Sequence, residues 1–351
     1  MVGGIYFGPP GWKLPSISAV PMNALPAALV HPTNRLELRT FLTQIDLDQT
    51  HPQIPALVSQ VGNIGGQKVK KLIINGLSLI PESRMGAICA RLDAEAIMTA
   101  VELIQRILSS PPTLLVFDRS DRRDVRPLLR IVRGRCQPVA LTTRYPAAHP
   151  AILARILGGC RVVDPLEEGI VSVDWLTCLL LGRALLQPVR CSHRPVQIFI
   201  AGHAPRVLWA QIGVPLREVF ALAGIDPGAM QCIGNGMLTG TELDLAAATM
   251  DMSIETLALR PIPPLETAVD CIRCGWCVQS CPAAINPASL YAAQCLHEGV
   301  ALADARDSLA CIDCGLCTYI CPSRLPLSAS IEEMRNRIEF NLVSAVGGSS
   351  I

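Results

Sequence analysis

The stretch CIRCGWCVQSCP, residues 271–282, places four cysteines in eleven positions, and CIDCGLCTYICP repeats the pattern at residues 311–322. Both copies have the spacing C-x2-C-x2-C-x3-C-P. Three thiolates this close in sequence can wrap one face of a cube-shaped cluster only if the loop between them is tight. Gly275 and Gly315, each directly after the second cysteine, relieve crowding in that loop. A fourth ligand then has to come from further away.

This spacing is typical of bacterial ferredoxins that hold 4Fe-4S clusters. In two-cluster ferredoxins the fourth cysteine of each motif ligates the cluster of the other motif, so we predict two crossed ligand sets. The first set is Cys271, Cys274, Cys277 and Cys321. The second set is Cys311, Cys314, Cys317 and Cys281. Crossing would staple the two distant stretches of chain together and bring the clusters close enough to exchange an electron.

Structural zinc and disulfides are the two rival interpretations of these cysteines. Zinc takes four ligands per ion and has no need of the third evenly spaced cysteine or of the Cys-Pro ending. Disulfides are disfavoured in the cytosol, which is the compartment that the chain's amino terminus indicates. We therefore favour iron-sulfur chemistry over both.

The other seven cysteines are isolated in the sequence, and we expect small buried side chains there rather than ligands. They are Cys89, Cys136, Cys160, Cys178, Cys191, Cys232 and Cys295. Cys295 lies on the helix expected between the two motifs, close to where a cluster would be. The six histidines are scattered and show no ligand spacing.

Composition excludes some classes of partner. The chain has 351 residues, enough for two or three domains, and half of them are apolar. Lys and Arg number 30 against 29 Asp and Glu, so no basic excess is available to hold a nucleic-acid backbone. Aromatic residues make up only 4%, which argues against base-stacking platforms. Nucleic acid is therefore not expected as a partner.

The sequence predicts no transmembrane segment of its own. The nearest candidate, VSVDWLTCLLLGRALL, is interrupted by Asp174 and Arg183. The start MVGGIYFGPPGWK lacks the charged beginning, apolar middle and cleavage site of a secretory signal. These features indicate a cytoplasmic protein, free or held to a membrane by partners.

Strands and helices alternate between about residues 68 and 135. KVKKLIING is an apolar run that ends at Gly76 and predicts a buried strand. Residues 93–108 have apolar positions at helical spacing, TLLVFD at 113–118 predicts a second strand, and RRDVRPLLRIV a second helix. This alternation predicts an α/β domain with a parallel sheet.

The pattern changes from about residue 195. PVQIFIAG predicts a strand, VPLREVFALAGI a short helix and QCIGNGMLTGTEL a glycine-broken loop, which together fit a small α+β domain. PIPPLETA, residues 261–268, reads as a proline-rich linker, placing a boundary near residue 260. Beyond it, residues 286–310 and LSASIEEMRNRIEF predict helices around the cysteine motifs.

Several segments, taken in order, resemble RnfC, the cluster-bearing subunit of the Rnf ion-pumping electron-transport complex, which is related to the flavin-bearing subunit of complex I. The segments are LIINGLSLIPES, RYPAAHPAILARILG, the unit from PVQIFIAG to VPLREVFALAGI, and CIRCGWCVQSCP with CIDCGLCTYICPSRLPL. The resemblance covers roughly residues 60–340. Its carboxyl-terminal part is specific, and its amino-terminal part is looser.

The resemblance implies four parts. Residues 1–60 would be an amino-terminal extended segment, and 61–189 an α/β domain similar to the FMN- and NADH-binding domain of the family. Residues 190–260 would be a soluble-ligand-binding (SLBB-like) β-grasp domain, and 261–345 a helical dicluster ferredoxin module. The eight motif cysteines match the cluster ligands of the family residue by residue.

The flavin site matches the family less well. Family members have GGAGFPT ahead of the LIING strand, where backbone N–H groups approach the cofactor phosphate, and an acidic ECEP stretch after it. Here the first is VGNIGGQKVKK and the second is LSLIPES, so Gly65, Gly66 and Glu82 remain but the Phe-Pro pair does not. We therefore expect that FMN is not bound and identify no catalytic residue.

Three functions remain open from the sequence. The first is an electron-relay subunit with two 4Fe-4S clusters, working with other subunits of a redox complex on the cytoplasmic face of the inner membrane, as the resemblance implies. The second is an enzyme in its own right, an FMN-dependent NADH:acceptor oxidoreductase similar to cobalamin reductase. The third is a structural subunit whose clusters only brace the fold. The dinucleotide site separates the first from the second.

Overall fold

The computed structural model describes residues 31–47, 49–142, 144–159, 164–187, 189–262, 267–295 and 307–347. The chain divides into two compact units, Met1–Ile262 and Pro263–Ile351. The first unit contains both sheets, so the α/β and α+β parts expected from the sequence pack together in it. The predicted linker at 261–268 lies next to the division, and four of its residues are outside the described part.

A four-stranded parallel sheet forms the centre of the first unit, in the order β3-β2-β1-β4. Its strands are β1 (Lys71–Asn75), β2 (Thr113–Asp118), β3 (Gln137–Leu141) and β4 (Ile170–Asp174). Ile73 of β1 is level with Leu114 of β2 on one side and Ser172 of β4 on the other. The predicted parallel sheet is present, and its central strand is largely apolar because helices cover both faces.

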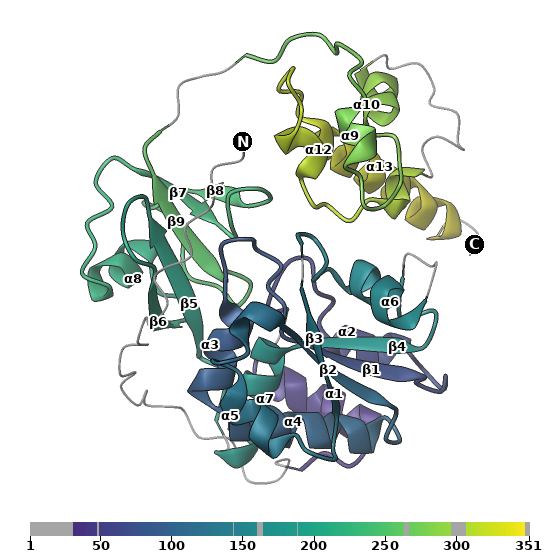
Figure 1. Cartoon of the computed structure of the whole chain (residues 1–351), viewed down its shortest axis with the longest axis vertical. Helices are drawn as coiled ribbons and strands as arrows, with labels where there is room; N and C mark the ends of the chain where they lie inside the picture. Colours follow the sequence, from purple (N-terminus) through teal and green to yellow (C-terminus); the bar gives the residue numbers. More distant parts are fainter. Residues whose placement is uncertain are drawn as a thin grey trace. The chain divides into compact units, whose positions relative to one another are not determined.

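Within the described part of the first unit, seven α-helices cover the sheet (Figure 1). They are α1 (Arg35–Gln44), α2 (Leu57–Asn63), α3 (Met85–Leu92), α4 (Ala94–Ile107), α5 (Arg126–Ile131), α6 (Pro150–Gly158) and α7 (Trp175–Leu186), with a 3-10 turn, η2 (Arg119–Asp121). Leu72 and Ile74 of β1 join the large core that all of these helices except α6 share. Ile73 points to the other face, where it packs with Leu153 and Ala154 of α6.

Helices α4 and α7 approach each other closely within the large core. A Cβ atom at Gly182 of α7 would lie 1.7 Å from the Ala96 carbonyl oxygen of α4. Only a glycine lets the two backbones meet at this crossing. The apolar stretch VSVDWLTCLLLGRALL, the nearest candidate for a transmembrane segment, consists of strand β4 followed by the buried helix α7.

A five-stranded mixed sheet forms the second part of the first unit, in the order β6-β5-β9-β7-β8. Its strands are β5 (His193–Ile200), β6 (Arg206–Gln211), β7 (Gln231–Gly234), β8 (Thr241–Leu243) and β9 (Thr256–Arg260). Helix α8 (Leu216–Leu222) packs Leu216, Val219 and Phe220 into its core. The loop predicted at 231–243 was wrong in one respect: it contains β7 and β8, which pair antiparallel.

A buried polar seam joins the two sheets. The Ser83 hydroxyl, in the loop after β1, donates to the carboxylate of Glu255 and contacts the side-chain oxygen of Gln197 on β5. The Arg194 guanidinium is fully buried and donates to the carbonyl oxygens of Thr50 and Met252. These hydrogen bonds connect the two parts inside the unit, while one buried nitrogen of Arg194 has no hydrogen-bond partner among the described residues.

The segment expected to be extended at the amino terminus differs from that expectation where it is described. Residues 1–30 lie outside the described part, whereas Arg35–Gln44 is helix α1. Asn34 caps the helix by accepting from the Glu37 N–H, and the Glu37 carboxylate accepts from the Thr33 N–H in return. The Asn34 cap satisfies an N–H group of the first helical turn, which favours a helix over an extended chain here.

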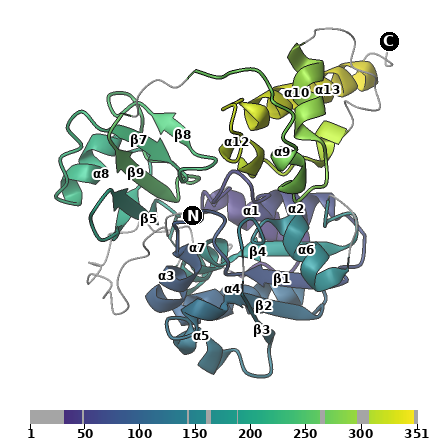
Figure 2. The same cartoon turned by 45° about the horizontal axis from the view of Figure 1, so that its top comes forward.

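The second unit is helical, as predicted, within its described residues (Figure 2). It contains α9 (Trp276–Gln279), α10 (Pro287–Cys295), the 3-10 turn η3 (Ser308–Ala310), α12 (Leu316–Tyr319) and α13 (Leu327–Gly347). The helix expected between the motifs is α10, and residues 296–306 of the same prediction lie outside the described part. In the described ranges of both units, no helix has the length and apolar character needed to cross a membrane.

Candidate metal centre

Each cysteine motif leads into a short helix through the same backbone turn. Gly275 and Gly315 adopt left-handed conformations, with φ of 77° and 70°, and cap α9 and α12. The third cysteine of each motif, Cys277 or Cys317, lies in the first turn of its helix. The predicted tightness of the loop thus comes from a glycine in the conformation that other residues avoid.

Four non-glycine residues repeat the same unusual conformation in both motifs. Arg273 and Asp313 have φ of 55° and 51°, and Ala284 and Arg324 have φ of 59° and 56°. The members of each pair occupy equivalent positions in the two copies of the repeat. Left-handed backbone is costly for residues with a Cβ, so its recurrence at equivalent positions indicates a constraint that both motifs share. Alternating right- and left-handed residues turn successive N–H groups toward one point.

Backbone N–H groups point at the cysteine sulfurs. Burial raises the pKa of Cys277, and the N–H groups of Val278 and Ala288 oppose that shift by donating to its sulfur. Burial likewise raises the pKa of Cys314, where the Leu316 N–H donates. Such N–H donors stabilise a thiolate and tune the potential of a cluster bound to it.

Burial raises the pKa of Cys311 to about 12 and the pKa of Cys317 to about 11. Without a metal these two thiols are therefore protonated near neutral pH. Binding iron requires the thiolate, so loading this site must release protons. Buried thiols of this kind suit an iron-containing group, because the positive charge of the iron stabilises the thiolates.

The fold brings the last cysteine of the first motif to the second motif. Cys281 is close enough to Cys314 and Cys317 for its charge to raise the pKa of both. In the opposite direction, Cys321 packs against an apolar cluster that contains Cys277 together with Cys317. Cys281 also packs against the same apolar cluster as Cys311, so the two motifs lie close together, and the crossed ligand sets stay a prediction.

The donor set of both motifs consists of cysteine thiols, the usual ligands of iron-sulfur clusters. Among the residues that the structure describes, no three His, Cys, Asp or Glu side chains form a group tight enough for one metal ion. Sulfur ligands arranged in this way, with N–H donors directed at them, suit iron-sulfur clusters.

An arginine from the last helix covers the second motif. Arg335 of α13 forms an ion pair with Asp313 at 2.7 Å and donates to the Cys311 carbonyl oxygen at 3.2 Å. The charge of Asp313 inside the motif was noticeable in the sequence, but its partner was not. The internal repeat does not point to Arg335 either, because the equivalent position in the first half is Cys295.

Most of the cysteines outside the motifs lie where the sequence suggested. Cys89, Cys178, Cys191 and Cys232 are buried, and burial raises the pKa of each. Cys136 is half-buried, and Cys160 lies outside the described residues. Cys295 differs, because it is exposed on α10 and forms a hydrogen bond with the Tyr291 hydroxyl.

The edge of the parallel sheet where α/β proteins bind nucleotides is filled by the chain itself. Ligands of such sheets lie outside the carboxyl ends of the strands where the strand order reverses, which here is between β1 and β4. At that point the indole of Trp175 packs on Gly76, where a Cβ would lie 2.3 Å from the ring. The Asn75 amide donates to the Ala148 carbonyl at 2.8 Å, and the Asp174 carboxylate accepts from Thr50 at 3.0 Å.

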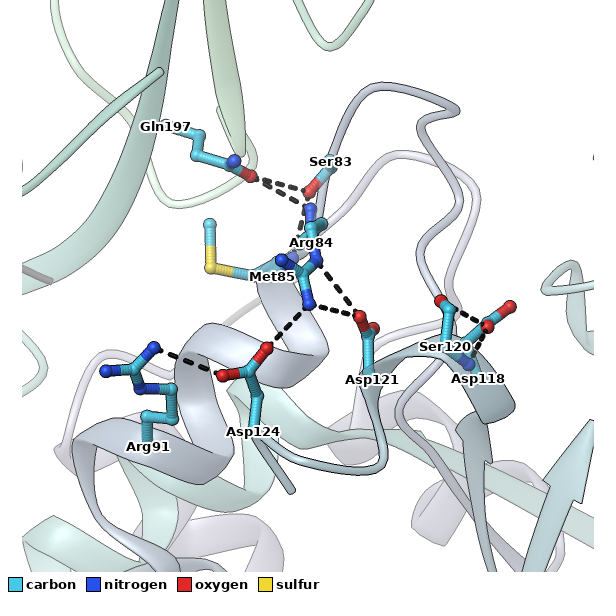
Figure 3. Close-up of polar contacts among 9 residues, drawn as sticks. All are labelled: Ser83, Arg84, Met85, Arg91, Asp118, Ser120, Asp121, Asp124 and Gln197. Atoms are coloured by element: carbon cyan, nitrogen blue, oxygen red, sulfur yellow. Dashed lines mark hydrogen bonds and ion pairs between the residues drawn. The ribbon is translucent and has the colours of Figure 1, made fainter. Parts of the chain in front are cut away.

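The carboxyl ends of β1 and β2 are also bridged by an ion-pair network (Figure 3). Arg84, which precedes α3, contacts Asp121 at 2.5 Å and Asp124 at 2.6 Å, and Arg91 reaches Asp124 at 3.1 Å. Burial disfavours the charge of Arg84, but the two carboxylates raise its pKa above the ordinary value. Glu82, the carboxylate left from the family pattern, has a buried oxygen without a hydrogen-bond partner in the described structure.

Comparisons with known proteins agree with the resemblance seen in the sequence. The chain is 29% identical over 242 residues to the C subunit of the ion-translocating oxidoreductase complex of Serratia proteamaculans, a match that covers 65% of this chain and 34% of the relative. The corresponding protein of Pseudomonas aeruginosa is 28% identical over 243 residues, covering 64% and 30%. No family model matches the chain.

Solved structures with a similar fold include an NAD+-reducing NiFe-hydrogenase in its air-oxidised state. The TM-score is 0.55 at 14% identity, and the match covers 68% of this chain and 49% of the hydrogenase chain. Its H2-reduced state gives a TM-score of 0.52. The predicted similarity to the C subunits of ion-translocating oxidoreductase complexes is thus confirmed, although the chain spans only about a third of the length of the curated relatives.

Proposed function

We propose that this chain is an electron-transfer subunit that relays electrons between protein partners through two 4Fe-4S clusters. One cluster would be held by Cys271, Cys274, Cys277 and Cys321. The other would be held by Cys311, Cys314, Cys317 and Cys281. The observation that carries the proposal is that Cys281 packs against the same apolar cluster as Cys311 of the opposite motif.

The bound clusters would supply one-electron chemistry. The chain's own residues provide the rest. The crossed ligands would hold the two halves of the module together, and backbone N–H groups donate to the sulfurs of Cys277 and Cys314. Arg335 balances the negative charge that a thiolate-ligated cluster would bring to Cys311. Burial of the second motif keeps water from that cluster.

The scaffold supports a relay more than an enzyme. The parallel sheet would correspond to the flavin domain of the family, and the mixed sheet with α8 to its β-grasp domain. However, Trp175 and Asn75 fill the point where a flavin or dinucleotide would lie in such a sheet. We therefore propose that FMN is not bound and that electrons come from a protein partner.

By the same similarity, the partners would be other subunits of an ion-translocating oxidoreductase complex. The chain would sit on the cytoplasmic face of the membrane that holds the complex, attached through those subunits. The described residues contain no helix that could span that membrane.

Iron and acid-labile sulfide analysis of anaerobically purified protein tests the proposal. Two cubanes require about eight irons and about eight sulfides per chain. A zinc site would instead give zinc without sulfide. Sulfide clearly below this value in a fully reconstituted sample would reject the two-cluster assignment.

A further inference from the structure

The two halves of the cysteine module are equivalent in sequence but not in their surroundings. The separation of Cys271 from Cys311 recurs for every other pair of motif cysteines and also relates α10, which begins at Pro287, to α13, which begins at Leu327. Equivalent side chains can therefore be compared directly. The differences among them show how each motif meets solvent.

The second motif is covered. Cys314 and Cys317 are buried, and Ile312, which lies between Cys311 and Cys314, is only 6% exposed. Arg335 ties α13 to the motif through the Asp313 carboxylate and the Cys311 carbonyl oxygen. A further hydrogen bond, between the Thr318 and Ser328 hydroxyls at 2.8 Å, joins α12 to α13.

The first motif is open. Cys271 and Cys274 are exposed, and Ile272, the counterpart of the buried Ile312, is 66% exposed. Trp276 is 50% exposed, whereas Cys277 beside it is buried like its counterpart Cys317. Arg273 occupies the position equivalent to Asp313. It is exposed and forms no ion pair among the described residues.

We infer that electrons enter and leave this module through the cluster of the first motif, with Arg273 at its solvent edge. The inference rests on the proposed function, because it requires that both clusters are bound. The second cluster would exchange electrons only with the first. Each exchange moves one electron from a reduced cluster to a one-electron oxidant, and no proton or bond is transferred.

The physical basis is distance and charge. Electron transfer slows steeply as donor and acceptor move apart, so the cluster with the thinner protein cover exchanges faster. A charge beside that cover also attracts or repels a charged partner, and this effect is strongest at low ionic strength. An exposed arginine at the first motif should therefore favour anionic oxidants over cationic ones.

The test uses the full chain with both clusters, reduced with dithionite and mixed with limiting oxidant in a stopped-flow instrument at low ionic strength. The two oxidants are ferricyanide, a trianion, and hexaammineruthenium(III), a trication. The variant is Arg273→Asp, because the equivalent position already carries Asp313 with nearly the same φ. The matched control is Arg130→Glu, which makes the same charge change at an exposed position of α5 in the other unit.

We expect Arg273→Asp to lower the ratio of the ferricyanide rate to the ruthenium rate by roughly tenfold for both electrons, and Arg130→Glu to change it by less than about twofold. A ratio that shifts equally in both variants would overturn the inference. A rate ratio that changes for only one of the two electrons would also overturn it, because the other electron would then leave directly from the second cluster. Iron content is measured in every sample, so a loss of clusters, which would count against the proposed function, is recognised separately.

Discussion

At the scale of single residues, the cysteines determine what this chain can do. Their spacing predicted two crossed ligand sets, and Cys281 packs against the same apolar cluster as Cys311 of the opposite motif. What the spacing did not predict is the set of residues that support them. Left-handed backbone at Arg273 and Asp313, and the contact from Arg335, depend on tertiary packing, which no local pattern encodes.

Replacing single ligands tests the crossed arrangement. If the sets are crossed, Cys321→Ser should change the EPR spectrum in the same way as Cys274→Ser, and Cys281→Ser in the same way as Cys314→Ser. Each variant should lose up to about four of the eight irons, because one cubane is affected. Cys295→Ser, which alters an exposed cysteine outside both sets, should keep the wild-type spectrum and iron content.

The outcome against crossing is equally specific. It would be a Cys321→Ser spectrum that matches Cys314→Ser instead of Cys274→Ser. That result would mean that each motif holds its own cluster with its own four cysteines.

A buried histidine should make the first unit sensitive to acid. Burial, together with the nearby charges of Arg194 and His149, lowers the pKa of His51 from 6.5 to about 3. Below pH 6.5 the unfolded chain binds a proton that the folded chain does not. The free energy of unfolding therefore decreases as the pH is lowered from 6.5 to about 3. The slope reaches at most about 1.4 kcal/mol per pH unit.

Urea unfolding of the full chain between pH 7 and pH 5, followed by far-UV circular dichroism, measures this contribution. We expect His51→Gln to lose less stability over that range than the wild type, by roughly 1–2 kcal/mol. The control is His203→Gln, because His203 is exposed. An unchanged pH dependence in His51→Gln would show that His51 does not bind the proton upon unfolding.

At the scale of elements, hydrophobic pattern and capping residues predicted most of the first unit. The strand TLLVFD coincides with β2, and the helix predicted at 93–108 is α4, which Asp93 caps. The second predicted helix is shorter than expected. Pro127 falls in the first turn of α5, where proline breaks no interior hydrogen bond, and the preceding residues form η2 and a turn.

Strands β7 and β8 were missed for a different reason. Glycines interrupt the stretch 231–243, and short strands separated by glycine look like a loop in the sequence. Gly234 lies close to the other strand, since a Cβ there would lie 2.7 Å from a methyl group of Leu243, which would have to move. The glycine that suggested a loop is thus part of a strand pair.

The crossing of α4 and α7 gives a prediction at this scale. Gly182→Ala should push the two helices apart, because its Cβ would lie 1.7 Å from the Ala96 carbonyl oxygen. We expect a loss of about 3 kcal/mol or more in the free energy of unfolding, at or beyond the upper end for overpacked cores. The urea midpoint, followed by far-UV circular dichroism, reports this change.

Gly66→Ala is the matched control, since a Cβ at Gly66 would meet no atom within 4 Å. It should stay within roughly 0.5 kcal/mol of the wild type. Equal stability of the two alanine variants would show that α4 and α7 can separate at little cost.

At the scale of the whole molecule, the chain combines a nucleotide-type scaffold with a cysteine module in a separate unit. The scaffold was predictable from alternating strands and helices. The contacts at the edge of the sheet were not predictable, because the sequence shows a shortened glycine-rich loop but not the packing of Trp175 on Gly76 or the ion pairs of Arg84.

This arrangement predicts that the chain does not oxidise NADH by itself. A NADH oxidation assay with an artificial electron acceptor should give no rate above the background, with or without added FMN. Protein carrying both clusters, reduced by dithionite, should pass electrons to the same acceptor. NADH-dependent reduction of the acceptor by the chain alone would favour the enzyme interpretation.

The central claim is that eight cysteines hold two clusters close enough to exchange electrons. EPR spectroscopy of the anaerobically prepared, dithionite-reduced chain tests it most directly. We expect a signal that integrates to about two spins per chain, broadened by interaction between neighbouring clusters. A colourless sample without an EPR signal after reconstitution with iron and sulfide would contradict it.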